Sequence, residues 1–203
     1  MEVKIKQLER KDFSKVIDFA IKGMHFERYV DNELALRLYG RYFLYLELER
    51  ATQVIAAYVG DKLVGVLMAD IKNKVRQCSS FWRKFYIKIF KTIMVILARG
   101  KADIYDETNK AMLDEYLKRA NPDGEICFLA ADPTIHGKGI GTLLLKELNK
   151  REKGKLIYLY TDNNCTYQFY EKKGFKRSEE KEIKMELGGK SILLTCLLYS
   201  KQL

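Results

Sequence analysis

The spacing of apolar and polar residues changes several times along the N-terminal part of the chain. Residues 3–8 alternate apolar and charged side chains, which predicts a short strand. From Asp12 onward the apolar residues recur at helical spacing, and residues 32–52 repeat that pattern, so two helices are predicted. Residues 54–59 and 63–71 are β-rich runs joined by a short turn that contains glycine, which predicts a hairpin.

The remainder of the chain begins with a helical stretch and then alternates between strands and helices. Residues 72–121 predict two helices, the first starting at Ser79 or Ser80 and ending at Gly100. The later predicted elements are a strand at 125–131, a helix at 142–150, a strand at 156–161, a helix at 163–173, and strands at 175–187 and 191–199. This order predicts an α/β fold with a mixed central sheet flanked by helices.

Composition narrows the class of protein. With 203 residues, 47% of them hydrophobic, and two prolines, the chain predicts one domain over 1–203, with 72–121 as a helical insertion inside it. The net charge of +10 favours an anionic partner. Four widely spaced cysteines without CxxC pairs argue against a metal site, and no signal peptide or membrane span is evident, so we expect a cytoplasmic protein without a metal.

A glycine cluster lies between the predicted strand at 125–131 and the helix that follows it. Gly137, Gly139 and Gly141 let the backbone approach a ligand closely, and Lys138 adds positive charge. The free N–H groups at the start of a helix favour an anion such as a pyrophosphate. The spacing fits neither the Rossmann fingerprint nor a P-loop. Taken alone, the cluster is also compatible with a tight strand–helix turn that uses glycine for steric reasons.

Two segments together resemble the GNAT acetyltransferase family. The run His136-Gly137-Lys138-Gly139-Ile140-Gly141 is similar to the family's Arg/Gln-x-x-Gly-x-Gly/Ala signature, with His136 as the departure, and Ala131-Asp132-Pro133 is similar to the lead-in before it. Residues 163–175, NNCTYQFYEKKGF, resemble the family's N…FYEKxGF segment. The resemblance is strong over about residues 125–175.

The resemblance implies a fold and a cosubstrate. It implies the GNAT fold, with about seven strands, a splay between the fourth and fifth strands, and acetyl-CoA as cosubstrate. By the same resemblance, Leu129, Ala130 and Ala131 would offer backbone groups to the pantetheine, and Asn163 would touch the cofactor. The residues expected to hold the pyrophosphate are His136, Gly137, Lys138, Gly139, Ile140, Gly141 and Thr142.

Acetyl transfer to an amine needs an acid for the leaving thiolate and a base for the ammonium. Tyr170 stands at the family's general-acid position, against the alternative of a packed helix aromatic. Glu125 resembles the general base of histone-type members, against the alternative of a solvated carboxylate at a strand end. Asp132 or a water chain are rival bases. Cys127 and Cys165 are interpreted as small apolar residues and not as nucleophiles.

The basic insertion and the acceptor stay open. Residues 72–102 hold no acidic residue, and their basic side chains alternate with aromatic ones. The favoured interpretation is an amphipathic helix packed on the domain, with a solvated basic face; the rivals are an acceptor-site wall that selects an acidic substrate or RNA, and contact with an anionic membrane. A homodimer is also open. The expected function is an acetyl-CoA-dependent N-acetyltransferase, and the alternative is a non-catalytic acyl-CoA or nucleic-acid binding module.

Overall fold

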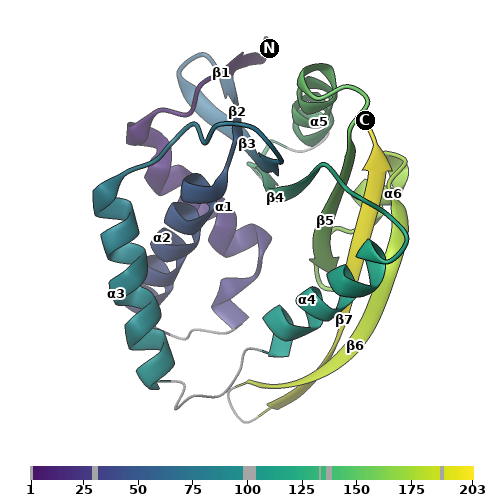
Figure 1. The fold of residues 1–203 in the computed structure, drawn as a ribbon. Helices are drawn as coiled ribbons and strands as arrows, with labels where there is room; N and C mark the ends of the chain where they lie inside the picture. The colour runs from purple at the N-terminus through teal and green to yellow at the C-terminus, as the bar shows by residue number, and fades with distance from the viewer. Residues whose placement is uncertain (1, 29–31, 98–103, 133, 136–138, 188–189) are drawn as a thin grey trace. The chain divides into compact units, whose positions relative to one another are not determined.

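The structure is a computed structural model of the chain. It describes residues 2–28, 32–97, 104–132, 134–135, 139–187 and 190–203 (Figure 1). Contacts within the chain divide it into two compact units. The first unit comprises Met1–Ile89 and Ile126–Lys153, and the second comprises Phe90–Glu125 and Gly154–Leu203. The prediction of one domain over 1–203 stays a prediction.

The first unit is built around the predicted hairpin. Strands β2 (Gln53–Val59) and β3 (Lys62–Ile71) pair antiparallel, and β1 (Lys4–Lys6) pairs antiparallel with β2. Helices α1 (Phe13–Gly23) and α2 (Glu33–Arg50) follow β1, and short 3₁₀ turns precede and follow α1. Asn32 starts α2 as predicted, because its side-chain oxygen accepts the N–H of Ala35.

One face of that hairpin meets the two helices. The core contains Val16 and Phe19 of α1, Leu44 and Leu48 of α2, and Tyr58 of β2, all buried. β2 and β3 are buried along nearly their whole length, and α5 (Ile140–Arg151) lies against both strands. Burial of both faces explains why these two strands are continuous apolar runs and do not alternate.

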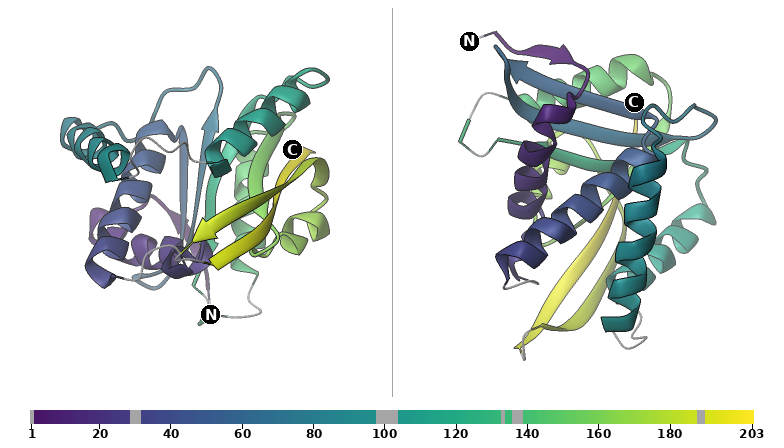
Figure 2. Two further views of the ribbon diagram at one scale, coloured as in Figure 1. Left: turned by 90° about the horizontal axis from the view of Figure 1, so that it is seen from below. Right: turned by 90° about the vertical axis from the view of Figure 1, so that its left-hand side faces the viewer.

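The second unit is a smaller sheet covered by a helix. Strand β5 (Leu156–Asp162) pairs antiparallel with β7 (Lys190–Gln202), which pairs antiparallel with β6 (Lys176–Leu187), the long hairpin seen in Figure 2. Helix α4 (Ile104–Leu117) packs its Met112 and Tyr116 against buried residues of this sheet. The last two predicted strands are therefore confirmed, and β7 continues beyond its predicted end.

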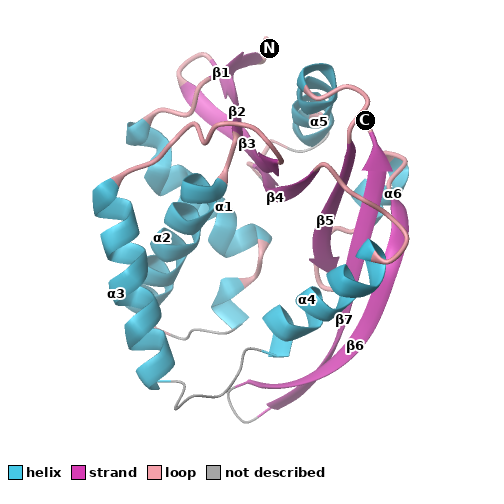
Figure 3. Cartoon of the chain, in the orientation of Figure 1, coloured by secondary structure: helices cyan, strands magenta, loops and turns pink. Residues whose placement is uncertain are grey.

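The strands form one mixed sheet in the order β1-β2-β3-β4-β5-β7-β6. Strand β4 (Gly124–Ala131) pairs parallel with β5 through two residue pairs, Gly124 with Ile157 and Glu125 with Tyr158. A seven-stranded mixed sheet flanked by helices confirms the predicted fold class, with strands and helices distinguished in Figure 3. The splay between the fourth and fifth strands stays a prediction.

The insertion between β3 and β4 is helical, as predicted. It contains α3 (Phe81–Leu97) and α4. Helix α3 begins after Ser80, whose N–H donates to the Glu49 carboxylate at 2.9 Å. Its predicted end at Gly100 lies outside the described residues. In the part of the chain that the structure describes, no helix combines the length and apolar character needed to cross a membrane.

One predicted helix is shorter than expected. The sequence predicts a helix over 163–173, whereas α6 spans Gln168–Lys172. The reason is Asp162, whose Oδ1 accepts the backbone N–H groups of Asn164 and Cys165 at 2.8 and 3.2 Å. An aspartate that bonds the backbone just after it stabilises a turn in competition with a helix.

Candidate active site

The loop after β4 is held by a buried aspartate. Asp132 Oδ1 accepts the hydroxyl and the N–H of Thr134 at 2.6 and 3.0 Å, and Lys15 Nζ of α1 lies 3.0 Å from Oδ2. The Asp132 N–H donates to the Val64 carbonyl at 2.9 Å, which ties the loop to β3. Burial alone would raise the pKa of Asp132, but the hydrogen bonds from Thr134 and the ammonium of Lys15 outweigh it and lower the pKa to about 2.

The start of α5 has the geometry expected of an anion-binding turn. Gly139 adopts a φ of 64°, in the left-handed region that favours glycine, and the helix begins at Ile140. Gly139 has no side chain to cap this N-terminus, and N–H groups of a first helical turn without such a cap can bind another acceptor. His136, Gly137 and Lys138 lie outside the described residues.

The other predicted cofactor residues of the first unit lie around that turn. Ile140 is buried in the core, so it offers only its backbone, whereas Gly141 and Thr142 are partly exposed. Leu129 and Ala130 are partly exposed and Ala131 is exposed at the end of β4. The exposure of β4 therefore increases toward Ala131, the end from which the glycine turn follows.

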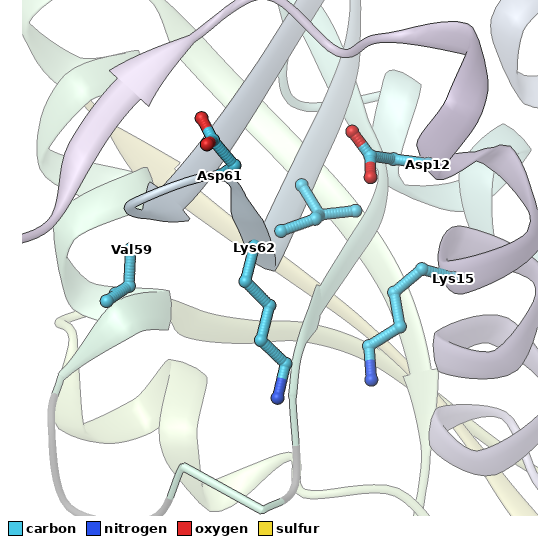
Figure 4. A pocket seen from close by; sticks show the side chains of 6 residues that line it. Asp12, Lys15, Val59, Asp61 and Lys62 are labelled. Atoms are coloured by element: carbon cyan, nitrogen blue, oxygen red, sulfur yellow. The ribbon is translucent and has the colours of Figure 1, made fainter.

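An open hollow of about 560 Å³ lies beside the hairpin turn of the first unit. Its lining residues are Asp12, Lys15, Val59, Asp61, Lys62 and Leu63, and Figure 4 shows the Lys15 and Lys62 side chains extending in the same direction. Sequence reasoning missed this hollow, because its lining comes from segments far apart in the chain and carries no motif. Its lining combines charged side chains of both signs with the apolar Val59 and Leu63.

Tyr170, the predicted acid, lies on α6 of the second unit. Its ring contacts those of Phe169 and Phe175 edge to face, with centroids 5.4 and 5.7 Å away. Its hydroxyl makes no hydrogen bond to any residue within the described ranges. Burial, and secondarily the neighbouring Cys165, raise the pKa of Tyr170, so the phenol keeps its proton at neutral pH.

Two further predicted residues have identified partners in the same unit. Glu125 Oε2 accepts a hydrogen bond from the Tyr158 hydroxyl at 3.3 Å. Asn163 donates its N–H to the Thr195 carbonyl and accepts the Thr195 N–H on Oδ1, both at 3.1 Å. The Asn163 side-chain oxygen is therefore engaged with β7, and only its amide nitrogen is left to contact a ligand. Its assignment to the cofactor stays a prediction.

Cys165 and Cys196 lack the environment of a nucleophile. Burial and the Asp162 carboxylate raise the pKa of Cys165 to about 12, and burial raises the pKa of Cys196 to about 12. A thiol with such a pKa is not ionised near neutral pH, and the thiolate is the nucleophilic form. Among the described residues, no group of three or more His, Cys, Asp or Glu side chains is arranged to hold a metal ion.

Part of the chain matches a known family by sequence. Residues 94–177 match the family model of the acetyltransferase (GNAT) domain. No curated protein matches the chain by sequence.

Solved structures with this fold include several acetyltransferases. The histone acetyltransferase HPA2-related protein of Corynebacterium glutamicum is 17% identical, with a TM-score of 0.58 over 100% of this chain and 97% of its own. The PaiA N-acetyltransferase of Thermoplasma acidophilum, solved with coenzyme A, is 18% identical with a TM-score of 0.53, and the polyamine N-acetyltransferase of Drosophila melanogaster is 12% identical with a TM-score of 0.60; both matches cover both chains completely.

At these identities the structural likeness establishes the fold, and the family model adds a sequence match to it. The resemblance to the GNAT family is therefore confirmed: the chain has the GNAT fold, and its residues 94–177 match the GNAT acetyltransferase domain.

Proposed function

We propose that this protein is an acetyl-CoA-dependent N-acetyltransferase that transfers the acetyl group directly from the thioester to an amine. The observation that carries the proposal is the start of α5, where the N-cap Gly139 takes a left-handed conformation and has no side chain to cap the helix. A helix N-terminus of this kind binds phosphate oxygens through its N–H groups. The diphosphate of coenzyme A is the ligand that the GNAT fold leads us to place there.

The cofactor would be held largely by the main chain. We assign the pyrophosphate to the turn of residues 136–142, with 136–138 assigned from the sequence alone. Leu129, Ala130 and Ala131 would bind the pantetheine arm through backbone groups, and the amide of Asn163 would add a further contact. Asp132 supports this arrangement by tying the loop before the turn to Lys15 and to β3. Because backbone groups carry most of the binding, His136 in place of Arg or Gln is tolerable.

Tyr170 would protonate the departing thiolate of coenzyme A. A general acid must be protonated at the working pH and must have its proton available. Tyr170 meets the first need because burial raises its pKa, and the second because its hydroxyl makes no hydrogen bond within the described part of the chain. The raised pKa of Cys165 argues against a covalent acetyl-cysteine intermediate there and so favours direct transfer.

Glu125 would take the proton from the acceptor ammonium. Its carboxylate already accepts a hydrogen bond from Tyr158, which fixes its orientation. Asp132, the rival base, is poorly suited because its pKa of about 2 makes it a very weak proton acceptor at neutral pH. Its two oxygens are also occupied by Thr134 and Lys15.

The test is the release of free coenzyme A thiol from acetyl-CoA across a panel of small amines, amino acids and peptides. Turnover with at least one amine is expected. With that amine, Tyr170→Phe is expected to lower kcat by about 10²-fold or more, because it removes the hydroxyl that carries the acidic proton and keeps the ring. Affinity for acetyl-CoA, measured by titration calorimetry, should be little changed.

Tyr167→Phe is the matched control, since Tyr167 precedes α6 by one residue and its ring lies against Arg177. It should leave kcat near the wild-type value. Binding of acetyl-CoA without turnover on any amine would instead support a non-catalytic acyl-CoA binding module. An unchanged kcat in Tyr170→Phe would remove Tyr170 from the mechanism.

A further inference from the structure

One side of helix α3 is attached to the first unit. The Arg83 guanidinium lies 2.8 Å from the Glu49 carboxylate of α2, and both side chains are nearly buried. Tyr86 donates to the Leu38 carbonyl at 3.1 Å and packs edge to face on Tyr45. Arg83 and Tyr86 are three residues apart, so they project from the same side of the helix. This side is the attached face of α3.

A second side of α3 is apolar and exposed. At 100° per residue, one third of the helix circumference carries only large apolar side chains and one threonine. Its apolar members are Phe81, Trp82, Phe85, Ile89, Ile93 and Ile96. All of them are exposed, and the fractions reach 73% for Phe81, 75% for Trp82 and 69% for Ile96. The sequence favoured an amphipathic helix packed on the domain with a solvated basic face; in the structure these apolar residues are exposed as well.

The third side of α3 is basic. Lys84, Lys88 and Lys91 are exposed and follow one another at helical spacing beside the apolar face. Residues 72–102 contain no acidic residue, and Glu49 of α2, which contacts α3, is paired with Arg83. The exposed surface of α3 is therefore an apolar stripe with a positive border, which we call the α3 surface.

The chemistry of the α3 surface selects among partners. A second copy of the chain could cover the stripe, but two α3 surfaces that faced each other would bring lysines of like charge together. Single-stranded nucleic acid would supply phosphates, but its bases stack on aromatic side chains, and three of the six apolar residues are isoleucines. An anionic bilayer fits both the apolar stripe and its basic border. Ile and Phe side chains can be buried among the acyl chains, and the lysines are attracted to the headgroup phosphates.

We propose that α3 is an interfacial helix that docks the protein on anionic lipid bilayers. The helix lies in the plane of the surface, with the stripe from Phe81 to Ile96 at the level of the upper acyl chains. Lys84, Lys88 and Lys91 lie among the headgroups, and the attached face keeps the helix joined to the first unit. The inference is independent of the acetyltransferase activity and would survive its failure.

The chain carries its own reporter for this docking. Trp82 is the only tryptophan, and it lies on the exposed stripe. On titration with vesicles of equal parts phosphatidylcholine and phosphatidylglycerol, its emission is expected to shift to the blue and to become protected from acrylamide. Vesicles of phosphatidylcholine alone should give little change. Salt near 1 M, where the Debye length is about 3 Å, should weaken the binding.

Variants separate the two features of the α3 surface. Phe85→Ser/Ile89→Ser should weaken vesicle binding in co-sedimentation by about tenfold or more. Lys84→Gln/Lys91→Gln should weaken it by a similar factor. The matched controls are Leu34→Ser, an exposed leucine of α2, and Lys110→Gln/Lys184→Gln, two exposed lysines outside α3, and both should bind like the wild type.

Four results would overturn the proposal. One is equal binding to neutral and anionic vesicles, and another is no binding to either. The third is a dimer in light scattering that Phe85→Ser/Ile89→Ser dissociates, which would assign the stripe to a second copy. The fourth is a salt-sensitive shift of an RNA oligonucleotide that the lysine variant abolishes while vesicles stay unbound. None of these bears on thiol release from acetyl-CoA, so the two proposals can fail separately.

Discussion

At the scale of single residues, Asp132 shows how far a sequence motif can be taken. The sequence places it in the lead-in to the glycine turn and offers it as a rival base. In the structure Asp132 instead anchors the loop after β4, because its carboxylate contacts Thr134 and Lys15. The contact with Thr134 could have been predicted from the sequence, because Thr134 is only two residues away. The contact with Lys15 could not, because only the fold brings α1 close to Asp132.

The pH dependence of the unfolding free energy tests whether Asp132 anchors this loop. The folded pKa is about 2 against an ordinary 3.8, so the stabilisation is complete above about pH 4 and is lost as the pH falls through 2. A shift of this size corresponds to about 2 kcal/mol. Asp132→Asn is therefore expected to lower the free energy of unfolding by about that amount at pH 7, measured in urea, and by much less at pH 2.

The control for this experiment is Asp114→Asn, since Asp114 is exposed on α4. Its unfolding free energy should match that of the wild type at both pH values. If Asp132→Asn lost the same amount of stability at pH 2 as at pH 7, the carboxylate charge would not be the source of the effect.

At the scale of elements, most strands and helices could be predicted from the sequence, but their exact ends and their exposure were predicted less well. The hairpin of β2 and β3 followed from two β-rich runs around a glycine turn, because such a hairpin depends on local residues. The shortening of α6 depends on Asp162, whose turn-forming bonds are also local and could have been predicted from the TDNN run. The exposure of the apolar face of α3 could not have been predicted, because the spacing of apolar residues does not distinguish a packed face from an exposed one.

The position of α5 depends on a glycine that the sequence did not single out. A Cβ on Gly65 of β3 would lie 2.6 Å from Ile140 Cγ2 and 3.2 Å from the Ala130 carbonyl oxygen. Gly65→Ala is therefore expected to cost about 1–3 kcal/mol in unfolding free energy, because α5 must move away from the sheet. It should also weaken acetyl-CoA binding, since the N-terminus of α5 moves with Ile140.

A double-mutant cycle tests whether the clash is the cause. Ile140→Ala removes the Cγ2 atom nearest to the new Cβ, so Gly65→Ala should cost less in that background than in the wild type. If the two costs were simply additive, the contact between residue 65 and residue 140 would not explain the loss. The readouts are urea denaturation and calorimetric titration with acetyl-CoA.

At the scale of the whole molecule, the fold class followed from the order of elements together with the GNAT resemblance. The order of strands in the sheet did not follow from spacing, because β7 lies between β5 and β6 and this pairing joins segments that are not consecutive. The division into two compact units was also not predictable, since Pro and Gly runs do not mark its boundaries. Contacts formed only in the fold decide both features.

Cofactor binding should appear as added stability of the whole chain. A ligand at 100 times its Kd that binds only the folded state adds about 2.7 kcal/mol, which for a chain of this length raises Tm by roughly 5–10 °C. Acetyl-CoA is expected to do so for the wild type in differential scanning calorimetry. In Gly139→Val, acetyl-CoA should no longer raise Tm, because a β-branched residue is strained at a φ of 64° and obstructs the turn. Gly154→Val meets similar backbone strain at a φ of 83° beyond the other end of α5, so it should lower Tm yet keep the rise. If both variants kept it, the anion site would lie elsewhere than at the start of α5.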